Sequence, residues 1–247
     1  MPDKNYCPVF IINLDCAKER MVNMHEQLTR LNIPYTRISA VKGIELSKDE
    51  IKQVYSSTDN KKYFRADLTL GEIGCYISHK HVWSKIVAEN IEYAVILEDD
   101  MILTQQFANI FKHNDIFKQY DLIKLADNRT HQPKQIKQID EHFEIINFTK
   151  IPNCATGYTI NLNGAKKLLA REKFYRPVDI DMQFCHELGL SVLGLRPYPI
   201  TENKNFTSDI TAINGGFHGH KCTSFSRNIK YRLHLWWHRK NYISGDL

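Results

Sequence analysis

Short apolar runs alternate with amphipathic segments along most of the chain. The run PVFIINL (residues 8 to 14) is rich in β-branched residues and predicts a strand. Apolar residues then recur at helical spacing over residues 17 to 31, which predicts a helix. The same reasoning predicts strands at residues 33 to 41, 93 to 97, 121 to 126, 143 to 148, 156 to 161 and 191 to 200, and helices at residues 47 to 57, 69 to 90, 105 to 113, 164 to 171 and 179 to 188. Strands that alternate with helices in this way favour an α/β fold with a mainly parallel sheet flanked by helices.

The strand predicted at residues 93 to 97 runs directly into three acids, in the segment YAVILEDDMIL. Side chains alternate along an extended chain, so Glu98 and Asp100 are expected on one side and Asp99 on the other. Two carboxylates at a strand end suit a hard divalent cation, Mg²⁺ or Mn²⁺, that also binds phosphate oxygens. The alternative is that the acids cap the next helix or face solvent. Because ligands of α/β sheets gather beyond the carboxyl ends of strands, this segment is a candidate site.

The composition is that of one large domain with room for a small appendage. The chain has 247 residues, of which 43% are hydrophobic. Its start lacks the pattern of a signal peptide, and nowhere do about 18 apolar residues run together. The six cysteines are scattered without a CxxC pair, which favours reduced thiols. We therefore expect a cytoplasmic protein.

Several segments together resemble glycosyltransferase family 25, the bacterial lipooligosaccharide and lipopolysaccharide sugar transferases related to collagen galactosyltransferases. In chain order they are FIINLDCAKER, IPYTRISAVKG, LTLGEIGCYISHKHVW, YAVILEDDMIL, ATGYTINLNGAKKLL and RPVDIDMQF. The resemblance covers roughly residues 8 to 210, and such coincident blocks are more specific than any single motif. It implies a nucleotide-sugar fold of the GT-A type, which we place at residues 1 to 220.

The resemblance also implies a UDP-sugar donor, most often UDP-galactose, and inversion at the anomeric carbon. Its acidic DxD-like motif falls on Glu98, Asp99 and Asp100, so that Glu98 and Asp100 are the expected metal ligands for Mn²⁺ or Mg²⁺. Position 98 is Glu where the generic motif has Asp, which leaves open whether it binds the metal directly or through water. A third ligand, expected late in the chain, is His218 or His220, with Glu202 and Asp209 as further candidates.

An inverting transfer needs a carboxylate that takes the proton of the attacking hydroxyl. The segment PVDIDMQF supplies Asp179 and Asp181, which lie on one side if the segment is extended. The resemblance is closest at PVD, so Asp179 is the favoured base. The alternative is that Asp179 caps the helix that follows.

The donor is expected between the first strand end and the segments AVKG and GEIGCYISH. Arg20 is placed to approach phosphate or ribose, unless it is an ordinary exposed helical residue. The resemblance places Glu72, Ser78 and His79 beside the donor or acceptor, although a buried histidine is more often a satisfied core residue. The full set of expected donor-binding residues is Asn13, Asp15, Arg20, Ala40, Gly43, Gly71, Glu72, Ser78, His79, Asp99, Gly157 and Tyr158.

Residues 221 to 247 form a basic and aromatic tail. Residues 221 to 240 carry six basic residues and no acid, while the formal net charge of the whole chain is +5. Basic residues mixed with tryptophans suit an anionic membrane surface, through residues 227 to 240. The alternative is a C-terminal helix that docks on the body through its tryptophans. The six basic residues of the tail account for the positive charge of the chain, so the rest of it is nearly neutral. This neutrality and the lack of a nucleic-acid fold signature argue against a nucleic-acid partner.

The sequence thus predicts an inverting transferase that moves galactose from UDP-galactose to a lipid-linked lipooligosaccharide or lipopolysaccharide acceptor, on the cytoplasmic face of the inner membrane. UDP-glucose or an N-acetylhexosamine donor is the nearest alternative. Two further alternatives are a nucleotidyltransferase, although the chain lacks a G-x-x-x-x-G-K phosphate loop, and a non-catalytic glycan-binding protein on the same fold. Acceptor contacts are expected from loops at residues 127 to 142 and 201 to 220.

Overall fold

The computed structural model describes residues 7–127, 132–203, 206, 224–242 and 244–247, and the account below concerns these residues. An eight-stranded sheet has the order β2-β1-β3-β8-β5-β9-β7-β6, and a second, two-stranded sheet pairs β10 with β4. The strands are β1 (Val9–Asn13), β2 (Thr36–Ser39), β3 (Tyr93–Glu98), β4 (Met101–Leu103), β5 (Leu122–Lys124), β6 (Pro133–Gln138), β7 (Glu144–Phe148), β8 (Gly157–Asn161), β9 (Val192–Arg196) and β10 (Ile200–Glu202). The helices are α1 (Lys18–Arg30), α2 (Lys48–Val54), α3 (Ser57–Tyr63), α4 (Leu70–Ala88), α5 (Asn114–Gln119), α6 (Leu162–Leu169), α7 (Val178–Gln183) and α9 (Phe225–Asn241), with 3-10 turns η1 (Gly43–Glu45), η2 (Phe107–Lys112) and η3 (Cys185–Leu188).

The large sheet is mixed. β1 pairs in parallel with β2 and β3, and β5 pairs in parallel with β9, whereas β8 lies antiparallel between β3 and β5. β7 is likewise antiparallel to both of its neighbours, β6 and β9. The expectation of a mainly parallel sheet therefore holds for the direction of most strands but not for their pairing. The apolar runs did not reveal the reversals because a strand buried on both faces has the same pattern in either direction.

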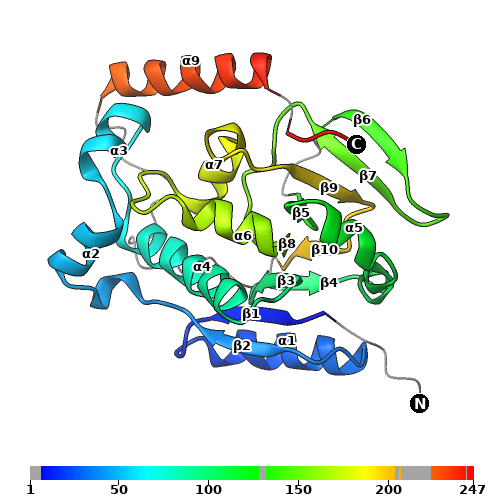
Figure 1. The fold of residues 1–247 in the computed structure, drawn as a ribbon. Helices are drawn as coiled ribbons and strands as arrows, with labels where there is room; N and C mark the ends of the chain where they lie inside the picture. The colour runs from blue at the N-terminus through cyan, green and yellow to red at the C-terminus, as the bar shows by residue number, and fades with distance from the viewer. Residues whose placement is uncertain (1–6, 128–131, 204–205, 207–223, 243) are drawn as a thin grey trace.

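Helices cover both faces of this sheet (Figure 1). Along β3, Val95 and Leu97 pack on the side of α1, η2 and α5, whereas Ala94 and Ile96 pack on the side of α4 and α6. The two faces alternate as the pleat requires. Because all of Tyr93–Leu97 is buried, the strand that carries the acids is fixed in the middle of the core.

The predicted helices form with clear start signals. Ser47 and Glu50 make a reciprocal capping box at α2, as the sequence indicates, and Thr69 and Glu72 make a second one at α4. α4 has apolar residues on two sides because it packs on the sheet with one side and contacts α6 with another.

Several segments differ from the sequence-based prediction, since α3, β4 and α5 were not predicted at all. Residues 133 to 138, expected in a loop, form the edge strand β6, whose polar and exposed side chains gave no hydrophobic signal. The predicted helix over residues 179 to 188 is divided into α7 and η3 at Phe184. Because α7 is helical, Asp179 and Asp181 are not on one side of an extended chain but about 200° apart around the helix.

The basic aromatic segment forms α9, which packs on α3 and beside α7 (Figure 1). Tyr231 and Leu235 are buried against Phe64 and Phe184. The tryptophans do not make this contact, because Trp236 is 58% exposed and Trp237 is 47% exposed. Docking through the tryptophans, one of the two alternatives drawn from the sequence, is therefore wrong.

The last residues return to the sheet. The Phe148 backbone N–H donates to Ser244 Oγ at 2.8 Å, and Leu247 packs against the core on the α1 side. Among the helices described, none combines the length and apolar composition needed to cross a membrane.

Candidate active site

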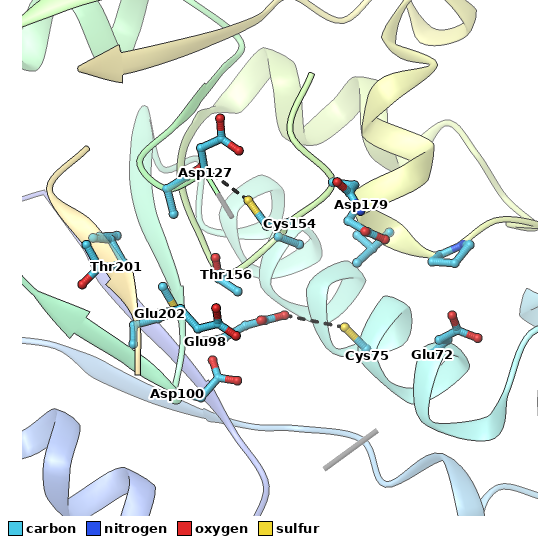
Figure 2. A pocket seen from close by; sticks show the side chains of 17 residues that line it. Glu72, Cys75, Glu98, Asp100, Asp127, Cys154, Thr156, Asp179, Thr201 and Glu202 are labelled. Atoms are coloured by element: carbon cyan, nitrogen blue, oxygen red, sulfur yellow. Dashed lines mark hydrogen bonds between the residues drawn. The ribbon is translucent and has the colours of Figure 1, made fainter. Parts of the chain in front are cut away.

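Two adjoining cavities meet at the acid cluster of Glu98, Asp99 and Asp100. The large cavity has a volume of about 340 Å³, and Figure 2 shows Glu98, Asp100, Glu202 and Asp179 around it. The small cavity has a volume of about 120 Å³ and lies between the end of β1, the residues before η1 and the start of α4. Cys75, Glu98 and Asp100 line both cavities. The acid cluster is therefore the wall between them.

The backbone holds the acid cluster between the two sheets. β3 ends at Glu98 in the large sheet, and β4 begins at Met101 in the small one. In the small sheet Glu202 stands opposite Met101, and the Asn203 N–H donates to the Asp100 carbonyl at 3.1 Å. Glu202 thereby reaches the wall of the large cavity beside Asp100. The sequence identified it only as one of several late candidates, because this contact depends on a pairing between distant strands.

Asp100 lies in surroundings that disfavour its charged form. Burial first, and then the neighbouring carboxylates of Glu98 and Asp99, raise the pKa of Asp100 to about 7. Its Oδ1 is buried without a hydrogen-bond partner among the described residues. An unpaired carboxylate oxygen beside Glu98 and Glu202 fits a hard divalent cation, since such ions prefer several oxygen ligands. The donor set therefore agrees with the metal expected from the sequence.

Asp99 points away from its two neighbours and is held by the protein itself. Asn13 Nδ2 donates to Asp99 Oδ2 at 2.6 Å, and Arg20 Nη1 lies 3.3 Å from Asp99 Oδ1. Burial raises the pKa of Asp99, although Asn13 and Arg20 oppose the shift. Asp99 lines only the small cavity, so Arg20 and Asp99 together form a polar floor there.

Glu98 accepts hydrogen bonds from α4. His79 Nε2 lies 3.3 Å, and Cys75 Sγ 3.7 Å, from Glu98 Oε1. Cys75 and His79 stand one turn apart on the same face of α4. The ligand atoms of these three residues lie within 4.8 Å of one another, a spacing at which an ion or shared hydrogens can hold them together.

Asp179 and Asp181 have different surroundings. Asp179 lines the large cavity, and burial, with Glu72 and Glu98 nearby, raises its pKa while Lys124 opposes the shift. Asp181 is 1% exposed and is bound by Tyr76 Oη at 2.7 Å and by Arg171 Nε at 2.7 Å. Arg176 adds a third contact to it at 3.2 Å. Asp181 is thus held in a buried ion-pair network away from the cavity.

Lys124 is a buried cation that the sequence reasoning missed. It is fully buried in β5, and its Nζ donates to the Cys154 carbonyl at 2.7 Å. Burial lowers its pKa, while the charge of Asp179 raises it. The bond fixes a segment whose Cys154 and Thr156 line the large cavity. A lysine inside the apolar run DLIKLA was the available signal.

The small cavity contains several predicted donor-binding residues, namely Arg20, Ala40, Gly43, Gly71, Ser78 and Asp99. A Cβ on Gly43 would lie 1.8 Å from the Leu70 carbonyl oxygen, so only glycine permits this close approach to α4. Ser78 Oγ ties the two segments by accepting from the Val41 N–H at 2.8 Å and donating to the Gly74 carbonyl at 2.7 Å.

Other predicted residues lie elsewhere. Glu72 lines the large cavity as it caps α4. Asp15 is exposed and paired with Arg37 outside both cavities, and Asn13 supports Asp99 from behind. Gly157 and Tyr158 are buried in β8, where the preceding residues line the large cavity instead. His218, His220 and Asp209 lie outside the described residues.

Comparison with known proteins identifies the family of this chain. The profile of glycosyltransferase family 25 (LPS biosynthesis protein) matches residues 6–183. A glycosyltransferase 25 family member from Aedes aegypti is 29% identical over 184 residues, which cover 70% of this chain and 29% of that protein. Procollagen galactosyltransferase 1-A from Xenopus laevis is 29% identical over 193 residues, covering 73% and 31%. A probable inactive glycosyltransferase 25 family member 3 from Rattus norvegicus is 27% identical over 183 residues, covering 70% and 31%.

The chain spans less than a third of the length of these relatives, since the matches cover 29% to 31% of each. The profile match includes the acid cluster, both sides of the small cavity and Asp179. Because it extends over well more than half of the sequence, the chain belongs to glycosyltransferase family 25.

Proposed function

We propose that this chain is an inverting transferase that moves galactose from UDP-galactose to a lipid-linked oligosaccharide. The observation that carries the proposal is the shared wall, where Asp100, with its unpaired Oδ1, stands between a small cavity floored by the Arg20–Asp99 ion pair and a large cavity that contains Asp179. A nucleotide diphosphate on one side and a sugar acceptor on the other would meet at this wall. The relatives named procollagen galactosyltransferases support galactose as the transferred sugar.

The acid cluster, with Glu202, is the proposed metal site. Glu98, Asp100 and Glu202 would hold Mn²⁺ or Mg²⁺, which would neutralise the charge that builds on the departing diphosphate. Arg20 lines the small cavity and adds positive charge near the same phosphates.

Asp179 is the proposed base. The acceptor oxygen attacks the anomeric carbon as the bond from that carbon to the UDP oxygen breaks, and the hydroxyl proton passes to the Asp179 carboxylate. The raised pKa of Asp179 strengthens it as a proton acceptor near neutral pH. Asp181 is left with a structural role, because two arginines and Tyr76 already occupy its oxygens.

The decisive test is a UDP-release assay with UDP-galactose, UDP-glucose and UDP-N-acetylhexosamines, with and without Mn²⁺. Lipooligosaccharide and collagen-like peptide acceptors are compared, since relatives are named for procollagen. We expect Mn²⁺-dependent release that is fastest with UDP-galactose and lipooligosaccharide. Release fastest with another donor or acceptor would overturn that specificity.

Replacing Asp179 by Asn is expected to lower turnover by a factor of about 100 or more while UDP and Mn²⁺ still bind, because general-base catalysis contributes on that scale. Asp181→Asn is the matched control, and it should lower stability but keep turnover per folded molecule. Normal activity of Asp179→Asn would remove Asp179 from this role. Binding of UDP-sugar by wild type without any release, across all acceptors, would favour the glycan-binding alternative.

We also propose that α9 places the enzyme on an anionic membrane surface at the cytoplasmic face, where a lipid-linked acceptor would be held. Its outer face exposes Leu233, Trp236 and Trp237, with Lys230 and Lys240 on the same helix. Aromatic side chains enter the interface while lysines meet anionic head groups. The inner face binds the body beside α7, so a membrane under α9 would lie close to the helix that carries Asp179.

Sedimentation with vesicles of phosphatidylglycerol and phosphatidylcholine tests this surface. Because deleting α9 would uncover Phe64 and Phe184, point variants are preferable. Trp236→Ser with Trp237→Ser should abolish binding, whereas Ile136→Ser, which removes an equally exposed apolar residue of β6, should not. Equal sedimentation of wild type and both variants would rule out membrane binding through Trp236 and Trp237. Self-association of wild type that is lost in the tryptophan variant would show that a second copy of the chain binds this face instead.

A further inference from the structure

A line of buried hydrogen bonds runs behind Glu98. Trp83 Nε1 donates to Tyr158 Oη at 2.9 Å, and Tyr158 Oη lies 2.8 Å from His79 Nδ1. The other ring nitrogen, His79 Nε2, lies 3.3 Å from Glu98 Oε1. Trp83, Tyr158 and His79 are each 0% exposed. Residues from α4, β8 and β3 therefore form a continuous chain that ends on a proposed metal ligand.

The partners at the two ends of this chain of contacts set the direction of its hydrogen bonds. An indole N–H can only donate, so the Tyr158 oxygen accepts from Trp83. The Tyr158 hydroxyl hydrogen then has His79 Nδ1 as its acceptor. The Glu98 carboxylate can only accept, so the ring hydrogen lies on Nε2 and points at Glu98. The contacts at the two ring nitrogens therefore agree on one histidine tautomer.

The fixed tautomer gives Glu98 a defined orientation. His79 Nε2–H and the Cys75 thiol both approach Oε1, which keeps Oε2 available for a cation in the cavity. The cluster of Cys75, His79 and Glu98 has the spacing of a metal site of its own. However, a metal on His79 would need the Nε2 lone pair, which the hydrogen occupies.

We propose that Trp83, Tyr158 and His79 are positioning residues that hold the Glu98 carboxylate for a divalent cation by presenting a fixed N–H to one of its oxygens. This inference rests on the proposed metal-dependent function. It assigns a role to the hydroxyl of Tyr158, which has no contact with either cavity. In other metal sites, removal of a residue that orients a metal ligand in this way weakens metal affinity roughly 10- to 100-fold.

Tyr158→Phe removes the one hydroxyl that joins Trp83 to His79. The measurement is the Mn²⁺ affinity of the full chain, obtained from the electron paramagnetic resonance signal of free Mn²⁺. No nucleotide-sugar donor and no sugar acceptor are present. We expect the Mn²⁺ dissociation constant to rise about 10-fold or more. Tyr76→Phe is a matched control, because Tyr76 is also 0% exposed on the same side of the sheet but donates to Asp181. It should lose stability and keep wild-type Mn²⁺ affinity.

A second pair of variants separates positioning from mere packing. His79→Gln keeps an N–H near the place of Nε2, so it should retain most of the Mn²⁺ affinity, whereas His79→Leu keeps the volume without the donor and should not. Wild-type affinity in Tyr158→Phe, or equal losses in Tyr76→Phe and Tyr158→Phe, would overturn the positioning role. A wild-type protein that binds no Mn²⁺ would instead overturn the proposed metal-dependent function, so the two failures are distinguishable.

Discussion

Replacing Asp100 by Asn is expected to make the cation-free protein more stable. Burial, Glu98 and Asp99 raise the pKa of Asp100 from 3.8 to about 7, so the folded state resists the charge that the unfolded chain carries. Between these two pKa values the unfolded state loses its proton first, and stability falls as pH rises. The whole shift, at about 1.4 kcal/mol per unit, corresponds to about 4 kcal/mol at pH 7 and above.

Asparagine recovers only part of that free energy, because its amide is also buried and one of its polar atoms takes the place of Asp100 Oδ1, which has no hydrogen-bond partner among the described residues. A gain of about 1–2 kcal/mol is a reasonable expectation, and in a chain of this size it raises the melting temperature by roughly 3–6 °C. Thermal unfolding in EDTA at pH 7.5 measures this gain. It should shrink as the pH is lowered from 7 toward 4, because the wild-type carboxyl is then protonated in the folded state and also begins to take up its proton in the unfolded state.

Excess Mn²⁺ is expected to reverse this order of stability. A ligand at about 100 times its dissociation constant stabilises the folded state by about 2.7 kcal/mol, so wild type should gain from excess Mn²⁺ while Asp100→Asn gains little. Glu141→Gln, at a side chain that is 84% exposed, is the control and should change neither curve. An Asp100→Asn protein that melts at or below wild type in EDTA at pH 7.5 would refute the argument that these acids repel one another.

Two further predictions concern the supports of the site. Although burial opposes it, Arg176 and Arg171 lower the pKa of Glu187 to about 2, so Glu187 stabilises the fold above pH 4.5 by about 3 kcal/mol and loses this as pH falls toward 2. Urea unfolding should therefore show that Glu187→Gln is less stable at pH 7 and that the gap narrows below pH 4.5; a constant gap would contradict this. Gly43→Ala should lower both melting temperature and UDP affinity, because its Cβ would meet the Leu70 carbonyl oxygen at 1.8 Å. Gly189→Ala, in open space at φ +58°, should cost about 1 kcal/mol and leave UDP binding unchanged in calorimetry.

The strand that carries the acid cluster could be predicted from the sequence alone. The apolar run before Glu98 indicated a buried strand, and alternation put Glu98 and Asp100 on one side, where both line the large cavity. The role of Tyr158 could not be predicted. All of β8 is buried, so its pattern carries no information about which side chain faces a functional residue.

The segment PVDIDMQF shows how a small error in local geometry changes an assignment. Read as extended chain, it offers two equivalent carboxylates, whereas in α7 it sends Asp179 to the cavity and Asp181 to Arg171 and Arg176. The arginines that occupy Asp181 come from the preceding residues of the chain, but nothing in their spacing shows that they turn inward.

α9 was ambiguous for a related reason. Tyr231 and Leu235 follow one helical stripe, and Leu233 and Trp236 follow another of similar spacing and similar apolar character. Periodicity identifies the helix but not the face that meets the body. Tyr231 and Leu235 form the buried stripe because they pack against Phe64 and Phe184, which are distant in sequence.

The shared wall between the two cavities has a consequence for how the substrates of this enzyme can diverge. Most of the unshared lining of the small cavity comes from β1, Arg20 of α1 and residues 40 to 43, whereas most of the unshared lining of the large cavity comes from residues 126 to 127, residues 153 to 156, α7 and β10; α4 contributes to both. With the acceptor in the large cavity and the nucleotide in the small one, as we propose, substitutions in the second group would reshape the acceptor chamber without touching the first. In an evolving lineage the choice of acceptor could then change while the nucleotide stays the same, with Glu98 and Asp100 as the fixed boundary between the two selections.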